Sequence, residues 1–201
     1  MNRSVVRLAL AGALLASALS AAGAQERPPL FPTRDVTINY KVLGRNGGQP
    51  ITISQAGGSS MMRVDNPEMG GFGLMDVTSG RATFVMTQMR MYMDMGPGQM
   101  PVHAMTPDKD AKFVRKGTDT VAGVGCTVWE VAAKQGDATA CVTADGVMLR
   151  VLTKGGDGME AQKVMFGPIP QTQFAVPAGF QKMDMPGMGA MPPGMGGQPR
   201  R

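Results

Sequence analysis

The sequence predicts a single, mostly β domain built around an antiparallel sheet, and three observations lead to this fold class. Short β-prone runs follow one another, and apolar and polar residues alternate in the first of them. Pairs containing glycine, asparagine or serine separate the runs at short intervals, as in a meander. No window shows a sustained apolar period of 3.6 residues, so we expect at most a short helix, near Pro107 to Ala111.

The first predicted strand is the clearest, because every second residue from Val36 to Val42 is apolar or aromatic and the residues between are polar. Five further strands are expected before a loop rich in Gly, Pro and Met at residues 96–107: Ile51–Gln55, Ser60–Val64, Phe72–Val77, Ala82–Gln88 and Arg90–Met95. Five more follow the loop: Lys112–Arg115, Cys126–Ala132, Ala138–Thr143, Val147–Thr153 and Ala161–Phe166. Asp145-Gly146 is typical of a hairpin turn.

Residues 1–24 have the three regions of a cleavable secretory signal. Arg3 and Arg7 precede an apolar run at residues 8–19, and small residues lead to a predicted cut before Gln25. The apolar run is too short to span a bilayer, so we expect no transmembrane segment in the mature chain. The predicted organisation is a signal peptide at 1–24, a linker at 25–33, the β domain at 34–182 and a tail at 183–201.

The tail differs in composition from the domain. Its 19 residues include five Met, five Gly and four Pro, with no aliphatic side chain larger than alanine. Such a segment cannot bury enough apolar surface to offset the entropy of ordering it, so we expect a disordered tail.

The two cysteines, Cys126 and Cys141, are predicted to form a structural disulfide, because export places them in an oxidising compartment. They lie on consecutive predicted strands. A turn centred on Gln135-Gly136 would place Cys126 opposite Asp145, so a direct cross-strand bond requires another turn position or a bulge. Two Cys and a single His also exclude zinc ribbons and multi-histidine metal sites.

Methionine is the chemical anomaly of the chain, with 20 residues. Met89, Met91, Met93 and Met95 occupy alternate positions and would share one face of a strand. That face is either core packing or the lining of an apolar cavity, for which Met86 is a further candidate. The alternative is a thioether site for Cu(I). Its candidate ligands are Met91, Met93, Met95, Met100, His103, Met105, Met183, Met185, Met188, Met191 and Met195.

We expect no catalytic residues and therefore no enzyme. The sequence contains no Gly-x-Ser-x-Gly elbow, no His-Glu-x-x-His and no phosphate-binding glycine loop that opens a helix. Without the signal peptide, 18 Lys and Arg balance 15 Asp and Glu, and no cluster of basic and aromatic residues is present. Nucleic acid is therefore not an expected partner.

Three blocks and the end of the domain together resemble a known family: residues 86–95, 117–131, 141–150 and 174–183. They resemble an uncharacterised family of exported Gram-negative proteins, which is similar to the LolA/LolB lipoprotein carriers. The resemblance implies a periplasmic protein with one strongly curved antiparallel sheet, a half-open β-barrel whose apolar concave face is closed by a small helical lid. It also implies binding of acyl chains or amphiphiles.

The sequence therefore favours a non-enzymatic periplasmic binding or chaperone-like protein with an apolar, Met-lined cavity for a lipid or other amphiphile. It needs no cofactor. A Met-rich Cu(I)-binding or buffering protein is the alternative, and a structural envelope protein without a small ligand is the third interpretation. An envelope protein remains a further candidate partner, and the sequence leaves the oligomeric state open.

Overall fold

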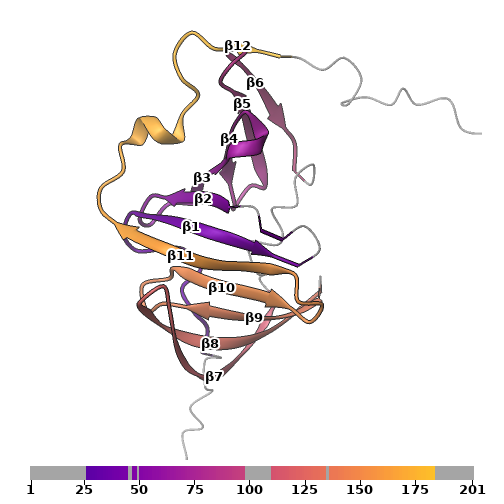
Figure 1. Cartoon of the computed structure of the whole chain (residues 1–201), viewed down its shortest axis with the longest axis vertical. Coiled ribbons are helices and arrows are strands. Elements are labelled where there is room, and N and C mark those ends of the chain that lie inside the picture. Colours follow the sequence, from indigo (N-terminus) through magenta and orange to yellow (C-terminus); the bar gives the residue numbers. More distant parts are fainter. Residues whose placement is uncertain (1–25, 45–46, 49, 98–109, 135, 184–201) are drawn as a thin grey trace, which may run out of the picture.

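The computed structural model describes residues 26–44, 47–48, 50–97, 110–134 and 136–183, which form one open sheet of twelve strands (Figure 1). The strands are β1 (Val36–Leu43), β2 (Pro50–Gln55), β3 (Met61–Asn66), β4 (Gly71–Asp76), β5 (Arg81–Met86), β6 (Met91–Met95), β7 (Lys112–Val121), β8 (Val124–Ala133), β9 (Gly136–Val142), β10 (Met148–Thr153), β11 (Gly158–Phe166) and β12 (Gln181–Lys182). In the described residues, helical structure is limited to the short 3-10 helices η1 (Pro67–Met69) and η3 (Gln171–Phe174). The predicted mostly β fold is confirmed.

Two meanders meet to form this sheet. The strand order is β12-β6-β5-β4-β3-β2-β1-β11-β10-β9-β8-β7, so the strands from β1 to β6 and those from β7 to β11 each lie beside their sequence neighbours. Antiparallel pairing of β1 with β11, in which Val36 lies opposite Phe166 and Leu43 opposite Gly158, joins the two halves. Only β12 pairs in parallel, with β6. The antiparallel meander is therefore confirmed within each half.

Register shifts bend the sheet into a half-open barrel. The shifts lie between Asn39 and Tyr40 in the β1–β11 pair, in β7 before Gly117, and in β10 before Arg150. An extra residue in one strand of an antiparallel pair increases the local twist and bends that strand. Figure 1 accordingly shows β4, β5 and β6 turned away from the direction of β1 and β11.

One face of the sheet, which we call the inner face, carries the core. It includes every second residue of β1, from Val36 through Tyr40, and the residues that lie opposite them in β2 and β11. The buried inner-face residues of the main cluster are Val36, Ile38, Tyr40, Ile53, Met62, Met75, Ala82, Met159 and Ala161. Farther along the sheet, Phe113, Trp129, Val131, Ala140 and Val142 form a second cluster.

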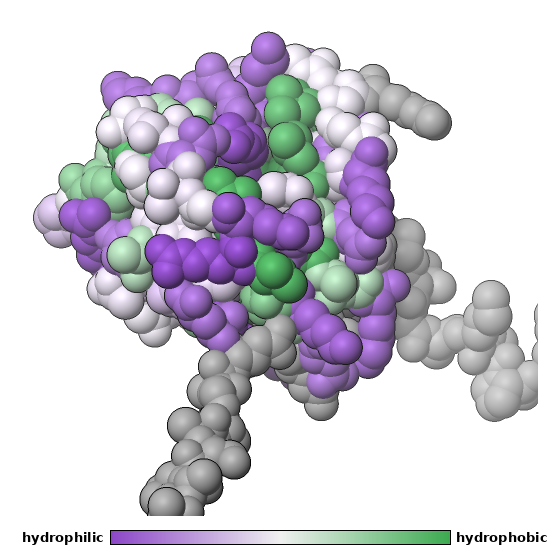
Figure 2. All heavy atoms as spheres, turned by 90° about the horizontal axis from the view of Figure 1, so that it is seen from below, coloured by the Kyte–Doolittle hydropathy of each residue, from purple (hydrophilic) through white to green (hydrophobic). Residues whose placement is uncertain are grey.

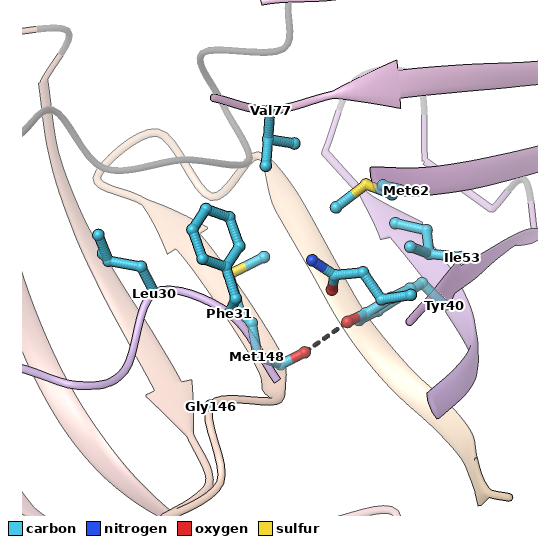
Figure 3. A pocket seen from close by; sticks show the side chains of 9 residues that line it. Leu30, Phe31, Tyr40, Ile53, Met62, Val77, Gly146 and Met148 are labelled. Atoms are coloured by element: carbon cyan, nitrogen blue, oxygen red, sulfur yellow. Dashed lines mark hydrogen bonds between the residues drawn. The ribbon is translucent and has the colours of Figure 1, made fainter. Parts of the chain in front are cut away.

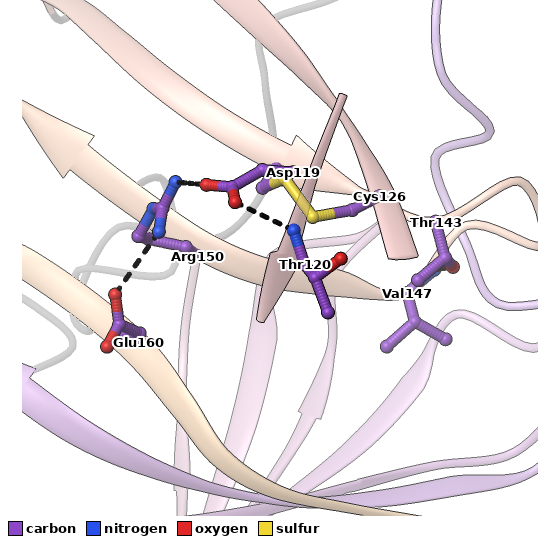
Figure 4. The surroundings of a disulfide bond; sticks show 8 residues. Asp119, Thr120, Cys126, Thr143, Val147, Arg150 and Glu160 are labelled. Carbon is purple, nitrogen blue, oxygen red and sulfur yellow. Dashed lines mark hydrogen bonds and ion pairs between the residues drawn. A yellow bond between two sulfur atoms is a disulfide. The ribbon is translucent and has the colours of Figure 1, made fainter. Parts of the chain in front are cut away.

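The predicted disulfide between Cys126 and Cys141 is present and joins β8 to β9 (Figure 4). Cys141 lies opposite Val128, so Cys126 is its diagonal neighbour on the same face, with 5.5 Å between the two Cα atoms. A diagonal bond removes the need for the bulge or shifted turn that a direct cross-strand bond would require. Nearby, the Arg150 guanidinium donates to Asp119 and holds the pKa of that carboxyl below its usual range.

Replacing both cysteines with serine should lower the free energy of unfolding by about 3 kcal/mol, because the bond closes a loop of about 15 residues in the unfolded chain. Urea denaturation followed by fluorescence of Trp129 measures this difference. The wild-type protein with a reducing agent should shift to the same midpoint as the double variant. An unchanged midpoint in both samples would contradict a stabilising role for the bond.

Candidate ligand-binding face

The pairing of β5 with β6 gathers methionines on the inner face. Met86 lies opposite Met91, and Phe84 lies opposite Met93. Side chains that lie directly opposite in an antiparallel pair point to the same side, with Cβ atoms about 4.5–5.5 Å apart. Met86, Met91 and Met93 are therefore neighbours on one face.

Met89 does not belong to this group, which corrects the prediction that four methionines share one strand face. The chain turns at residues 87–90, and Arg90 has a left-handed backbone with φ of 52°. This turn interrupts the alternation of side chains, and Met89 lies outside the strand with 59% of its surface exposed. The turn also shortens the two predicted strands on either side of it. The strand predicted at Ala82–Gln88 ends at Met86, and the strand predicted at Arg90–Met95 begins at Met91.

Burial decreases along the inner face toward the methionines. Met62, Met75 and Ala82 lie opposite one another on β3, β4 and β5, and all three are buried in the core. Met95 continues this row and packs against the core cluster. Four residues farther along β5, Met86 is only half-buried, as are Met91 and Met93 on β6. We call Val64, Phe84, Met86, Met91 and Met93 the methionine face.

Gly73 leaves a gap in this face. It lies on β4 between Val64 and Phe84, and a methyl group placed on it would meet only the Val64 carbonyl oxygen, at 4.0 Å. Its two strand neighbours therefore face each other across a position that no side chain fills. The result is a gap whose floor is backbone and whose walls are apolar side chains, and Gly73 itself is buried; we call this gap the groove.

The opposite face of the same strands is closed. Phe72, Leu74 and Val85 are buried there, and the half-buried Tyr92, Val176 and Phe180 pack against them. The Arg63 guanidinium also lies 3.6 Å from the centre of the Phe72 ring. β12 then pairs with the edge of β6, where the Met183 N–H donates to the Tyr92 carbonyl at 2.7 Å. A ligand on β4 to β6 would therefore use the inner face.

A small cavity lies deeper in the inner face, between the two halves of the sheet (Figure 3). Its volume of about 40 Å³ accommodates a few water molecules and is far below the ~300 Å³ of small ligand pockets. It is lined by Leu30, Phe31, Tyr40, Ile53, Gln55, Met62, Val77, Gly146 and Met148. The Tyr40 hydroxyl donates to the Met148 carbonyl, and burial raises the pKa of Tyr40 well above its usual value. None of the five methionines predicted to line a cavity borders this one.

The N-terminal strap, which we define as residues 27–34, crosses the inner face from β7 to β1. Figure 1 shows it as the indigo segment that precedes β1 and passes along β9 and β10. The Arg27 guanidinium lies 5.3 Å from the centre of the Phe113 ring on β7. At the other end of the strap, Arg34 lies 3.5 Å from the ring centre of Phe166 on β11. This part of the predicted linker therefore packs on the domain.

Several predicted metal ligands lie outside the described residues: Met100, His103, Met105, Met185, Met188, Met191 and Met195. Met183 is half-buried beside β6. Within the described ranges, no group of three or more His, Cys, Asp or Glu side chains is placed to hold a metal ion. Most of the predicted helix near residues 107–111 and nearly all of the tail are likewise outside the described residues.

Sequence reasoning missed Gly73, Val64 and Phe84 at the groove, and Leu30 and Phe31 at the cavity. The alternation in the run Phe72–Val77 placed a glycine at an inner position, which was the available signal for the gap. For the strap, an apolar pair flanked by prolines was visible at residues 28–32.

These features define the class of the protein by its fold: an open, curved antiparallel sheet with an apolar inner face. The disulfide indicates an oxidising compartment. Among the helices of the described residues, none has the length and apolar character needed to cross a membrane. In the view of Figure 2, hydrophilic side chains break up the apolar ones over the surface.

Solved structures are similar to this chain at low sequence identity. An uncharacterized conserved protein from Thermus thermophilus matches with a TM-score of 0.50 and 10% identity, over 75% of this chain and 90% of that chain. MucB matches with a TM-score of 0.49 and 15% identity, over 74% of this chain and 59% of MucB. The MucA/MucB complex of Pseudomonas aeruginosa matches with a TM-score of 0.46 and 16% identity, over 72% of this chain and 56% of that chain.

These likenesses concern the fold alone, and this chain spans less than two thirds of MucB. No protein-family model matches the chain, and no curated protein matches it either. The half-open sheet implied by the family resemblance is present, whereas membership of that family remains a prediction.

The Asp35 carboxylate holds the strap end of β1 in place and should make stability depend on pH. It accepts from the N–H groups of Gly57 and Ile169, each at 2.7 Å. These two hydrogen bonds hold the pKa of Asp35 below its usual value. The stabilisation is therefore complete above the usual Asp pKa and is lost as the pH falls through the lowered one.

Asp35→Asn should accordingly lower the melting temperature at pH 7, and the gap to wild type should narrow as the pH falls below about 4. Thermal unfolding followed by circular dichroism at pH 7, 5, 4 and 3 measures this difference in melting temperature. Asp157→Asn, an exposed carboxylate in the β10–β11 turn, provides the comparison of the same chemistry. A gap for Asp35→Asn that is constant over this range would show that the carboxylate charge is not responsible.

Proposed function

We propose that this protein is a non-enzymatic periplasmic binding protein that holds the acyl chain of a lipid or other amphiphile on its inner face. The observation that carries the proposal is the groove at Gly73, which half-buried apolar side chains flank and which continues into the core. The side chains that flank the groove keep part of their apolar surface exposed, which costs free energy in the unbound protein and supports a binding site here.

The dimensions of the inner face support an elongated apolar ligand. Strands in a sheet lie about 4.8 Å apart, so the path from β6 to β1 crosses five spacings, or roughly 24 Å before curvature shortens it. This is about the extended length of a long acyl chain. Methionine suits such a site, because its flexible, polarisable side chain adapts to ligands of different shape.

The charges around the groove support a ligand whose polar group remains outside it. Asp94 lies next to the methionine face in sequence but points to the other side of β6, where Thr83 and Lys182 interact with it. The hydrogen bond from the Thr83 hydroxyl and the nearby Lys182 ammonium keep the pKa of Asp94 below its usual range. The wall of the groove itself is thioether and aromatic carbon, which offers an acyl chain dispersion contacts without unpaired polar groups.

The double change Met91→Asp with Met93→Asp should weaken binding of a fluorescent fatty acid, dansylated undecanoic acid, by at least tenfold, because two carboxylates would line the groove. Fluorescence titration of the mature protein measures the affinity. Met89→Asp is the matched control, because Met89 is exposed in the adjoining turn, and it should bind as wild type does. Circular dichroism and thermal unfolding check that each variant is folded.

A second variant tests the groove without adding charge. Gly73→Ile should fill the gap between Val64 and Phe84 and lower the affinity for the same probe, while the β-branched side chain suits a strand. Gly125→Ile places the same side chain on β8, where nothing lies within 4 Å of the added Cβ, and should leave the affinity unchanged. Unchanged affinity in folded Gly73→Ile and in the folded double Asp variant would refute the proposed site.

The register of β5 and β6 also favours a second candidate function, Cu(I) binding. Met86 and Met91 lie directly opposite, and Met93 is their neighbour on the same face, which places three thioethers close together. Soft sulfur ligands select Cu(I) over harder cations. The methionines and His103 outside the described residues remain candidate additional ligands.

For this alternative, the mature protein should compete with the chelator bicinchoninate for Cu(I). Met86→Leu, Met91→Leu and Met93→Leu combined should remove that competition, because leucine keeps the apolar volume and lacks the sulfur. Met69→Leu, exposed at η1, is the control. Absorbance of the copper–chelator complex measures the transfer. Equal competition by the triple variant would exclude the methionine face as the copper site.

A further inference from the structure

The N-terminal strap occupies the part of the inner face into which the groove leads. Pro28 and Pro32 are buried, and Phe31 packs against the main core cluster. Leu30 and Phe31 border the 40 Å³ cavity across from Ile53 and Met62; Phe31 is half-buried, and 48% of Leu30 is exposed. Figure 3 shows the Phe31 ring between Val77 and Met148, so it fills the space between the two halves of the sheet.

This cavity and the methionine face belong to one continuous surface. Met62 lines the cavity, and the row that follows it leads to β6 through the buried Met75 and Ala82 and the half-buried Met95. An apolar chain that enters at the methionine face and follows this row therefore meets Phe31 at the cavity. With the strap in place the free volume is too small for an acyl chain, because it accommodates only a few water molecules.

The backbone of the strap is suited to reversible attachment. Pro28, Pro29 and Pro32 lack N–H groups, so the segment cannot form a full ladder with a strand. Two backbone hydrogen bonds anchor its C-terminal end: the Thr33 N–H donates to the Asp145 carbonyl at 2.9 Å, and the Gly58 N–H donates to the Pro32 carbonyl at 2.7 Å. The predicted cleavage before Gln25 would place the other end of the strap close to the terminus of the mature chain.

The remaining anchors are also exchangeable with water. The Arg34–Asp145 ion pair is solvent-exposed, with 57% and 23% of the two side chains accessible, so screening makes it a weak constraint. Gly146 allows the close approach of the strap, because a Cβ there would lie 2.3 Å from the Phe31 carbonyl oxygen. Within residues 28–31, the buried Pro28 and the packing of Phe31 on the main core cluster are apolar contacts, the same kind that a lipid chain would make.

We propose that the strap is an intramolecular competitor for the binding site, and that an apolar ligand binds by displacing Leu30 and Phe31 from the inner face. This inference rests on the proposed function and adds its regulation. A ligand that requires the displaced state has an apparent affinity equal to its intrinsic affinity multiplied by the fraction of molecules in which the strap is displaced. Weakening the strap must therefore strengthen ligand binding, whereas a merely structural segment would not have this effect.

The test compares the affinity of the full mature chain and its variants for dansylated undecanoic acid. Phe31→Ala should bind about tenfold more tightly than wild type, and Leu30→Ser should shift the affinity in the same direction with less effect on packing. Phe180→Ala is the matched control, because that half-buried ring packs on the opposite face. A synthetic peptide of residues 26–34 should compete with the probe for Phe31→Ala.

Hydrogen exchange gives an independent measurement on the wild-type protein. Saturating probe should accelerate exchange of the Thr33 and Gly58 amides, because both hydrogen bonds break when the strap leaves. Probe binding with unchanged exchange and no gain in Phe31→Ala and Leu30→Ser would overturn the strap proposal and leave the proposed function standing. Absence of probe binding to wild type and to both folded strap variants would overturn the proposed function together with it.

Discussion

The pairing of β1 with β11 is the contact on which the rest of the structure depends. It joins residues that are more than 100 positions apart in sequence, since Val36 lies opposite Phe166. Without it the chain would be two separate meanders, each with an apolar face and no partner to bury it. With it, the inner faces of both halves become one surface, and the apolar side chains of β2, β3, β10 and β11 can share a core. Such a distant contact carries a large loop-closure entropy, which the shared core offsets.

The bulge in this pair has consequences for the site. The register shift places the extra residue, Gln162, in β11 opposite the Asn39–Tyr40 step. β1 keeps its alternation, so Tyr40 lies on the inner face with Val36 and Ile38, and its hydroxyl donates to the Met148 carbonyl. The same region leaves the Asn39 side-chain oxygen buried without a hydrogen-bond partner. Buried unpaired polar atoms are destabilising, so the bulge is maintained at a cost. The bend it contributes creates the space between the two halves of the sheet.

The two edges of the sheet are protected in different ways, which disfavours binding of a further strand at either edge. β12 pairs with part of the β6 edge. The long edge strand β7 carries exposed Lys112, Arg115 and Lys116 and has a bulge before Gly117. Charges and bulges on an edge strand oppose pairing with another strand. On the inner face of β3 to β6, the apolar side chains that keep partial solvent access include those of the methionine face.

The strands and turns were largely predictable from sequence, because alternation and turn residues are local signals. β7 shows where local signals fail: only Lys112–Arg115 was expected, whereas the strand continues to Val121. The bulge shifts the alternation of apolar and polar residues. The edge position also allows Thr118, Asp119 and Thr120 to be exposed together, so no apolar–polar alternation marked this segment as a strand. The left-handed Arg90 that removes Met89 from the strand is unusual for a non-glycine residue and had no clear signature. The groove and the cavity depend on the β1–β11 register and the position of the strap, which no local pattern encodes.

The composition of the inner face is consistent with the proposed binding function, because it indicates how the protein would remain stable without a ligand. An open apolar groove would favour aggregation, but a covalently attached segment covers part of it at a small entropic cost, because its local concentration is fixed by the chain. The strap contributes proline and aromatic surface, whereas the exposed end of the groove is mainly methionine. Prolines reduce the conformational freedom that the strap loses when it docks, and methionines let the open end adapt to what binds there. Under the proposed mechanism, closure by such a segment would permit an apolar chain to enter without unfolding the sheet.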